Sequence, residues 1–235
     1  MSLNKIKSEL RAYSDPKRKA FSPSFFKTGK GEYAEGDKFI GVTVPNIRKI
    51  AKKYIDINEK DIEKLLHSQW HEERFIAWVI VINRYEKSVH KGYWYSFALN
   101  NISQLNNWDL VDMVVPRLIG DYLVGKSQKQ FLTWSSHPSL WIRRIAMMAT
   151  FPRIKQNDFS LTLKLSKRYL TDSEDLIHKA TGWMLREIGK RDERELIKFM
   201  DDNHREMPRI MVSYALEKIS SEKKKKYKLK KIRNK

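Results

Sequence analysis

Apolar residues along the 235-residue chain recur at intervals of three and four positions, the spacing of amphipathic helices rather than of strands. The clearest stripes share this spacing: Phe75, Val79 and Ile82; Leu161, Leu165 and Tyr169; and Ile177, Ala180, Met184 and Ile188. Only 9 Gly and 7 Pro interrupt the pattern. The pattern predicts about a dozen helices joined by short links.

Proline residues and short polar side chains mark several expected helix starts. Pro45 and Pro138 each open an amphipathic segment, and Asp172 and Ser173 can cap a helix that runs to Lys190. The chain shows no alternation of strands and helices and no glycine-rich phosphate loop. Many short helices of similar length are typical of an all-α solenoid built from helical pairs.

One segment, residues 28–42, departs from the helical pattern. Its sequence, TGKGEYAEGDKFIGV, holds four of the nine glycines. Tyr33, Phe39 and Val42 are strand formers, and Glu35-Gly36-Asp37 is a turn signal. We predict a β-hairpin or an ordered loop inserted between helices. A surface loop without a function is the other interpretation.

The chain is strongly basic. It has 47 Lys and Arg against 28 Asp and Glu, a net charge of +19. Residues 222–235 contain nine basic residues and one acid, and the rest still has 38 basic against 27 acidic residues, or +11. Such a field attracts DNA, RNA or an anionic membrane surface. The tail, residues 221–235, is either a nucleic-acid-binding arm or a solvated helix end.

Composition excludes several classes of protein. Without cysteine there is no disulfide framework, no zinc-thiolate site and no cysteine nucleophile. The longest apolar run, 75–82, has eight residues, whereas a membrane-spanning helix needs about twenty. The N-terminus has no apolar core of a secretory signal. We therefore expect a cytoplasmic protein that does not act in a membrane.

The histidines give little sign of a metal site. His67 and His71 are four positions apart, a spacing that suits a metal on a helix. Because neither a cysteine nor a well-placed third ligand accompanies them, the sequence favours two surface histidines. His137 and His178 are interpreted as structural. We expect neither a metal nor a cofactor.

The segment 106–123 carries the first candidate for chemistry. Its predicted buried face is made of Val111, Val115, Leu118 and Tyr122. Trp108 and Asp112, four positions apart, lie together at the edge of that face. A carboxylate beside a tryptophan at an apolar boundary is a functional candidate, but the other interpretation is that Asp112 caps a neighbouring helix or pairs with a core arginine. Pro116 is expected to kink this helix or end its first part.

The segment 138–148 places an arginine where a core residue belongs. Trp141, Ile145 and Met148 share one face, and Arg144 lies on it, whereas Arg143 points nearly opposite, toward the expected surface. A buried arginine needs an anionic partner, either a protein carboxylate or a phosphate of a ligand.

The segment 175–191 combines an aromatic ring with positive charge. Trp183 falls outside the buried stripe, on a line with Lys179, Arg186 and Lys190. Cations that contact phosphates around a ring that packs on sugar or base fit a nucleic-acid surface. The other interpretation is a tryptophan packed against the next repeat and covered by lysine stems.

Three motifs follow one another in the chain: NNWDLVD (106–112), LWIRR (140–144) and HKATGWMLRE (178–187). Together they resemble the AlkD branch of the HEAT-like repeat DNA glycosylases, in the AlkC/AlkD alkylation-repair superfamily. Residues 25–45 and 207–218 are similar to related bacterial DNA alkylation repair proteins. The resemblance covers about residues 5–220 in the same order.

This resemblance implies a right-handed α-solenoid, a single domain over 1–220, whose basic concave face cradles duplex DNA. It implies a monomeric, monofunctional glycosylase that hydrolyses the N-glycosidic bond of N3- or N7-alkylated purines. Asp112 matches the family's catalytic carboxylate, and Trp108 and Trp183 match the tryptophans that flank the sugar. Arg144 matches an arginine near the phosphate backbone.

The segment 28–42 points to a different branch. It resembles the β-hairpin of the AlkF/AlkG sister branch, whose members bind branched DNA without glycosylase activity. A hairpin there could enter the major groove. A non-catalytic binder of branched DNA is therefore the second hypothesis, and a helical-repeat scaffold for protein or RNA is the third.

Overall fold

Helices make up the regular structure of residues 2–227, the part of the chain that the computed structural model describes, and these residues contain no β-strand. The only β-type pairing within them is an isolated bridge between Lys38 and Trp70. The chain divides into two compact units, Met1–Tyr122 and Leu123–Lys235. The predicted all-α, helical-repeat fold is confirmed, and the single domain over 1–220 stays a prediction.

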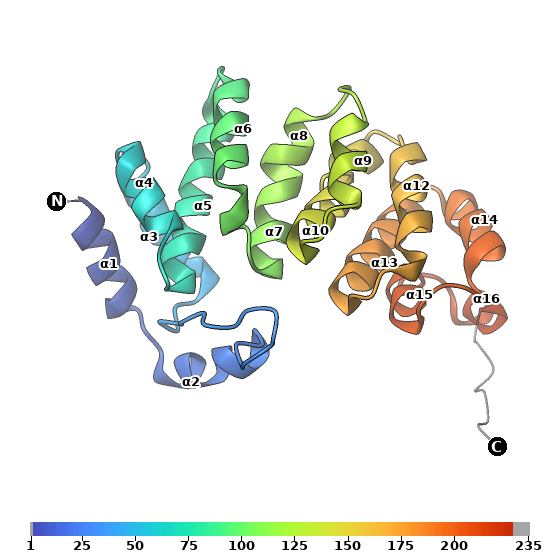
Figure 1. Ribbon diagram of the computed structural model, residues 1–235, viewed down its shortest axis with the longest axis horizontal. Coiled ribbons are helices and arrows are strands. Elements are labelled where there is room, and N and C mark those ends of the chain that lie inside the picture. Colours follow the sequence, from blue (N-terminus) through green and yellow to red (C-terminus); the bar gives the residue numbers. More distant parts are fainter. Residues whose placement is uncertain (1, 228–235) are drawn as a thin grey trace. The chain divides into compact units, whose positions relative to one another are not determined.

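The first unit is built around one long helix, α5 (Figure 1). Its elements are α1 (Ser2–Ala12), α2 (Pro16–Phe25), α3 (Val44–Lys53), α4 (Glu59–Leu66), α5 (His71–Lys87), α6 (Lys91–Asn100), the 3₁₀-helix η1 (Ile102–Gln104), α7 (Trp108–Val114), the π-helix η2 (Val115–Ile119) and α8 (Gly120–Tyr122). Helices α3, α4, α6 and α7 all pack against α5. Because it is surrounded in this way, α5 is buried at nearly every position from its first turn.

The second unit is organised around α13. Its elements are α9 (Lys129–Ser135), α10 (Leu140–Met148), α11 (Phe151–Lys155), α12 (Ser160–Arg168), the 3₁₀-helix η3 (Tyr169–Thr171), α13 (Asp175–Gly189), α14 (Glu193–Asn203), α15 (Arg209–Ala215) and α16 (Ser221–Lys226). Helices α10, α14 and α15 pack on α13. At Gly182 a Cβ atom would stand only 2.5 Å from the carbonyl oxygen of Met211, so α13 and α15 approach backbone to backbone.

The hydrophobic pattern predicted most of the core. Every residue of the three predicted stripes is buried, but Tyr122 and Trp141, which the pattern also placed on apolar faces, are only half-buried. Helix starts were less accurate: α3 begins beside Pro45 as predicted, but α10 begins two residues after Pro138. Helix α13 begins at Asp175, while Asp172 accepts a hydrogen bond from the Glu174 N–H at 3.0 Å instead of serving as the N-cap.

Pro116 changes the helix geometry as predicted. Helix α7 ends at Val114, and the backbone continues as one π-helical stretch, Val115–Ile119. A proline lacks the N–H that an α-helix would bond, and a local π turn accommodates it.

The predicted β-hairpin over 28–42 is wrong, and the ordered-loop alternative describes the segment. Its backbone forms successive turns, and the N–H groups of Ile40, Gly41 and Val42 have no partner strand. They donate to the buried carboxylate of Glu72 on α5, at 2.9, 2.7 and 3.2 Å respectively. A side chain from a helix thus takes the place of the second strand.

We expect Gly41→Ala to destabilise the first unit by about 2 kcal/mol, because Gly41 has a φ of +92° and an added Cβ would lie 2.5 Å from the carbonyl oxygen of Asp15. Gly31→Ala is the matched control, since Gly31 also has a positive φ, +78°, but open space around it. Urea unfolding of the three proteins checks this. Equal effects of the two substitutions would show that the contact with Asp15 costs nothing.

Within residues 2–227, no helix is both long and apolar enough to cross a membrane.

Candidate functional site

Helix α7 presents Trp108 and Asp112 at an accessible edge. Asn107 caps the helix, and its side-chain oxygen accepts from the Trp108 N–H at 2.8 Å. Leu110, Val111 and Val114 are fully buried, whereas Trp108 and Asp112 are half-buried. One helical turn separates the two side chains, so the ring and the carboxylate lie on the same side of α7, as the spacing predicted.

Aromatic residues at the end of α2 hold the ring of Trp108. Phe26 stacks on it, with ring centroids 5.4 Å apart and an interplanar angle of 16°. Phe25 meets it edge-on at 5.8 Å and 71°. Phe21 and Phe25 are 60% and 49% exposed, so aromatic surface extends from Trp108 toward solvent. Hydrophobic periodicity does not single out these residues, although large aromatics beside Lys and Arg in a segment without an apolar stripe are visible in the sequence.

A buried ionic cluster lies beside this aromatic group. The His71 ring contacts Asp109 of α7 through Nε2 at 2.7 Å and Asp37 of the loop through Nδ1 at 3.6 Å. Arg74 donates to both carboxylate oxygens of Asp37 at 2.7 Å. We name His71, Arg74, Asp37 and Asp109 the His71 cluster.

The prediction that His67 and His71 are two surface histidines is wrong for His71, which is 3% exposed, while His67 is exposed. His67 follows the end of α4 and His71 begins α5, so the two do not share one helix. The sequence held a signal for burial, since His71 stands four positions before Phe75 on the apolar stripe. Among the described residues no group of three or more His, Asp or Glu could hold a metal ion.

The surroundings favour the charged forms of His71 and Asp37. Burial alone would lower the pKa of His71, but the charge of Asp109 and the hydrogen bonds to Asp109 and Asp37 raise it to about 9. Burial would raise the pKa of Asp37, but His71 and Arg74 together hold it below its usual value.

Of the two arginines of α10, Arg144 is buried as predicted, whereas Arg143 is not at the free surface. Arg144 donates to the carbonyl oxygen of Leu176. Arg143 donates to both oxygens of Asp172, at 2.7 and 3.2 Å, and its side chain is only 14% exposed. The helical wheel of α10 could not show that the link before α13 covers this side.

The basic stripe of α13 also contains an acid. Trp183 is half-buried, and its Nε1–H donates to Glu187 at 3.1 Å. Lys190 pairs with Glu187 at 2.6 Å, and Arg186 pairs with Glu217. Two of the three predicted DNA-binding cations on α13 are therefore ion-paired, whereas Lys179 has no acidic partner among the described residues.

The two histidines interpreted as structural, His137 and His178, both make local contacts. His178 is buried, with Nδ1 3.8 Å from Asp175 one turn earlier. His137 accepts a hydrogen bond from the Ser139 N–H at 3.0 Å, just before α10.

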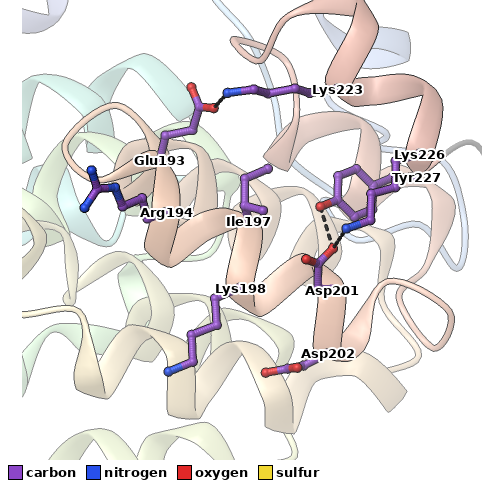
Figure 2. Close-up of a pocket in the computed structure, with 9 residues that line it drawn as sticks. All are labelled: Glu193, Arg194, Ile197, Lys198, Asp201, Asp202, Lys223, Lys226 and Tyr227. Carbon is purple, nitrogen blue, oxygen red and sulfur yellow. Dashed lines mark hydrogen bonds and ion pairs between the residues drawn. The ribbon is translucent and has the colours of Figure 1, made fainter.

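The second unit also has a pocket of about 670 Å³ between α14 and α16 (Figure 2). Two of its three carboxylates are ion-paired: Lys223 pairs with Glu193, and Lys226 and the Tyr227 hydroxyl bind Asp201 at 2.5 and 2.7 Å. None of the predicted site residues lines it. These contacts anchor the start of the basic tail on α14, and the predicted tail beyond Tyr227 lies outside the described residues.

These features define a helical-repeat protein with a tryptophan and a carboxylate at the accessible edge of one helix. The sequence model of the DNA alkylation repair enzyme family matches residues 6–219, and the chain belongs to that family. This membership supports a role in DNA repair.

A solved structure has the same fold. The chain is similar to a predicted DNA alkylation repair enzyme from Enterococcus faecalis, with a TM-score of 0.68 and 15% identity. The match covers 88% of this chain and 97% of that one. A comparison with curated proteins found no match.

Proposed function

We propose that the protein is a monofunctional DNA glycosylase that hydrolyses the N-glycosidic bond of N3- or N7-alkylated purines in duplex DNA. The observation that carries this proposal is the position of Trp108 and Asp112, one turn apart on the same side of α7. The two are half-buried side by side on a helix whose other face is fully buried, in a chain of the DNA alkylation repair family.

The chemistry of the substrate requires one catalytic carboxylate and no separate general acid. An N3- or N7-alkylated purine carries a positive charge, so when its bond to C1′ breaks, the bonding electron pair neutralises the base. The base therefore needs no strong general acid, and the positive charge passes to an oxocarbenium-like sugar. Asp112 would stabilise that charge and orient a water, whose oxygen bonds to C1′ while its proton passes to Asp112 or to solvent.

The other candidate residues would contact the DNA. The ring of Trp108, beside Asp112, offers packing and cation–π attraction to the developing positive charge. Trp183, on α13 of the second unit, is a further proposed aromatic contact to the DNA. Arg144, Lys179, Arg186 and Lys190 are the proposed phosphate contacts. Because Arg186 and Lys190 must exchange carboxylates for phosphates, Lys179 should contribute most of the binding energy of this stripe.

The test is base release from methylated duplex DNA by the wild-type protein. We expect free 7-methylguanine and 3-methyladenine, with no purine released from unmethylated duplex of the same sequence. Detection of the bases by chromatography with mass spectrometry measures this.

Binding of branched DNA without base release would instead favour the non-catalytic alternative. The hairpin that suggested this alternative is not formed. The affinity for methylated duplex or for branched DNA should fall as the salt concentration rises. An affinity that did not depend on salt would contradict the proposed phosphate contacts.

A further inference from the structure

The His71 cluster joins three segments of the first unit at one buried point. His71 and Arg74 belong to α5, Asp109 to the first turn of α7 and Asp37 to the loop between α2 and α3. The side chains of His71 and Arg74 are 4% and 3% exposed, and those of Asp37 and Asp109 are 10% and 16% exposed. No step of the proposed reaction uses this cluster.

The charges of the cluster balance only when the imidazole is protonated. Two carboxylates, Asp37 and Asp109, then face two cations, His71 and Arg74. A neutral imidazole has one N–H, so it would leave one carboxylate without a donor from the ring and a net negative charge in a buried place. Such a charge is costly, so loss of the proton should disturb the carboxylates and the segments that carry them.

The cluster also contacts the aromatic group that holds Trp108. The His71 ring lies 5.0 Å from the ring of Phe26, and Phe26 in turn stacks on Trp108. Asp109, the partner of Nε2, is the residue next to Trp108 in the first turn of α7. His71 thus reaches Trp108 by two routes, one through packed rings and one through the start of the helix.

We propose that His71 is a positioning residue, whose imidazolium holds Asp109 and Asp37 and thereby fixes the ring of Trp108 at the accessible edge of α7. Its importance for catalysis rests on the proposed glycosylase function, whereas its effect on Trp108 does not. His71 touches no reacting atom in this proposal. It acts through Asp109 and Phe26.

The ionisation of His71 makes this testable by pH. Because the folded-state pKa of His71 is about 9, above the 6.5 of a free imidazole, the cluster's contribution is complete below about pH 6.5 and is lost as the pH rises through 9. Asp37, Asp109 and Arg74 are the charged groups that face the ring, at 3.6, 2.7 and 3.5 Å from its nitrogens. A response centred near pH 9 therefore reports His71.

The experiment is ¹⁹F NMR of protein labelled with 5-fluorotryptophan, between pH 6 and 10. The Trp108 resonance is assigned by its absence in Trp108→Phe. We expect it to shift with a midpoint near pH 9, the same midpoint as the imidazole ¹⁵N signals of His71. A Trp108 resonance that stays constant through pH 10 while His71 titrates would overturn the proposal, and this measurement needs no variant of His71.

Two variants sharpen the result. His71→Gln should abolish the pH-dependent shift of Trp108, and His67→Gln, which changes an exposed histidine four positions earlier, should preserve it. In a glycosylase assay under single-turnover conditions, His71→Gln should slow base release about 10- to 100-fold with DNA affinity unchanged. A wild-type protein that releases no base defeats the proposed function alone, whereas a shift of Trp108 that persists in His71→Gln defeats the positioning role alone.

Discussion

Replacing Asp112 by asparagine is expected to slow the release of 7-methylguanine about 10²- to 10³-fold, equivalent to about 3–4 kcal/mol of transition-state stabilisation. The substitution keeps the shape of the side chain and removes its negative charge. If the carboxylate acts on the positive sugar, the loss falls on the single-turnover rate, and the affinity for methylated duplex should stay within about twofold. Single-turnover base release at saturating protein measures the rate, and fluorescence anisotropy with labelled DNA measures the affinity.

Two comparisons keep this result interpretable. Asp202→Asn removes a charge from an exposed position on α14 and should leave the rate unchanged. Thermal unfolding of Asp112→Asn separates a catalytic loss from a folding defect. A variant that is folded and releases the base at the wild-type rate would remove Asp112 from the mechanism, while activity of the wild type would still identify a glycosylase.

The sequence predicted what depends on local periodicity. The stripe Ile177, Ala180, Met184 and Ile188 is buried because a helix repeats every 3.6 residues, so residue types alone locate its inner face. The same periodicity placed Trp108 and Asp112 at the edge of α7, and the missing N–H of Pro116 located the interruption that follows. These conclusions require no knowledge of what packs against each helix.

The sequence failed where a residue's environment comes from another element. His71 was interpreted as a surface residue because Asp37 and Asp109, its partners, are 34 and 38 positions away in the chain. Arg143 is paired because Asp172, which precedes the next long helix, covers that side of α10. In both cases the decisive contact is tertiary, and a helical wheel holds no information about it.

The segment 28–42 shows that strand propensity alone does not predict a hairpin. Phe39 and Val42 favour extended backbone, and both are buried, but a hairpin also needs a second strand to receive its N–H groups. Here the carboxylate of Glu72, at the start of α5, receives three of them. Because the carboxylate of Glu72 already satisfies these backbone N–H groups, residues 40–42 need no second strand.

Glu72→Ala should therefore be among the most destabilising single substitutions in the first unit, costing about 3 kcal/mol or more. Glu72 is 4% exposed, and its loss would leave the N–H groups of Ile40, Gly41 and Val42 without an acceptor in a buried place. A buried donor left unpaired costs about 1–3 kcal/mol, and relaxation of the loop returns part of that sum. Chemical denaturation followed by circular dichroism measures the free energy of unfolding.

Two further variants in the same assay show whether the lost stability comes from the missing hydrogen-bond acceptor or merely from removal of a glutamate side chain. Glu72→Gln keeps one carbonyl oxygen, so it should retain part of the stability that Glu72→Ala loses. Glu63→Ala, which removes an exposed carboxylate on α4, should change the free energy of unfolding by less than about 0.5 kcal/mol. If Glu72→Ala were no more destabilising than Glu63→Ala, the carboxylate would not be what orders residues 40–42. Other contacts, such as the hydrogen bond from the Asp15 N–H to the Gly41 carbonyl oxygen and the pairing of Arg74 with Asp37, would then hold the loop.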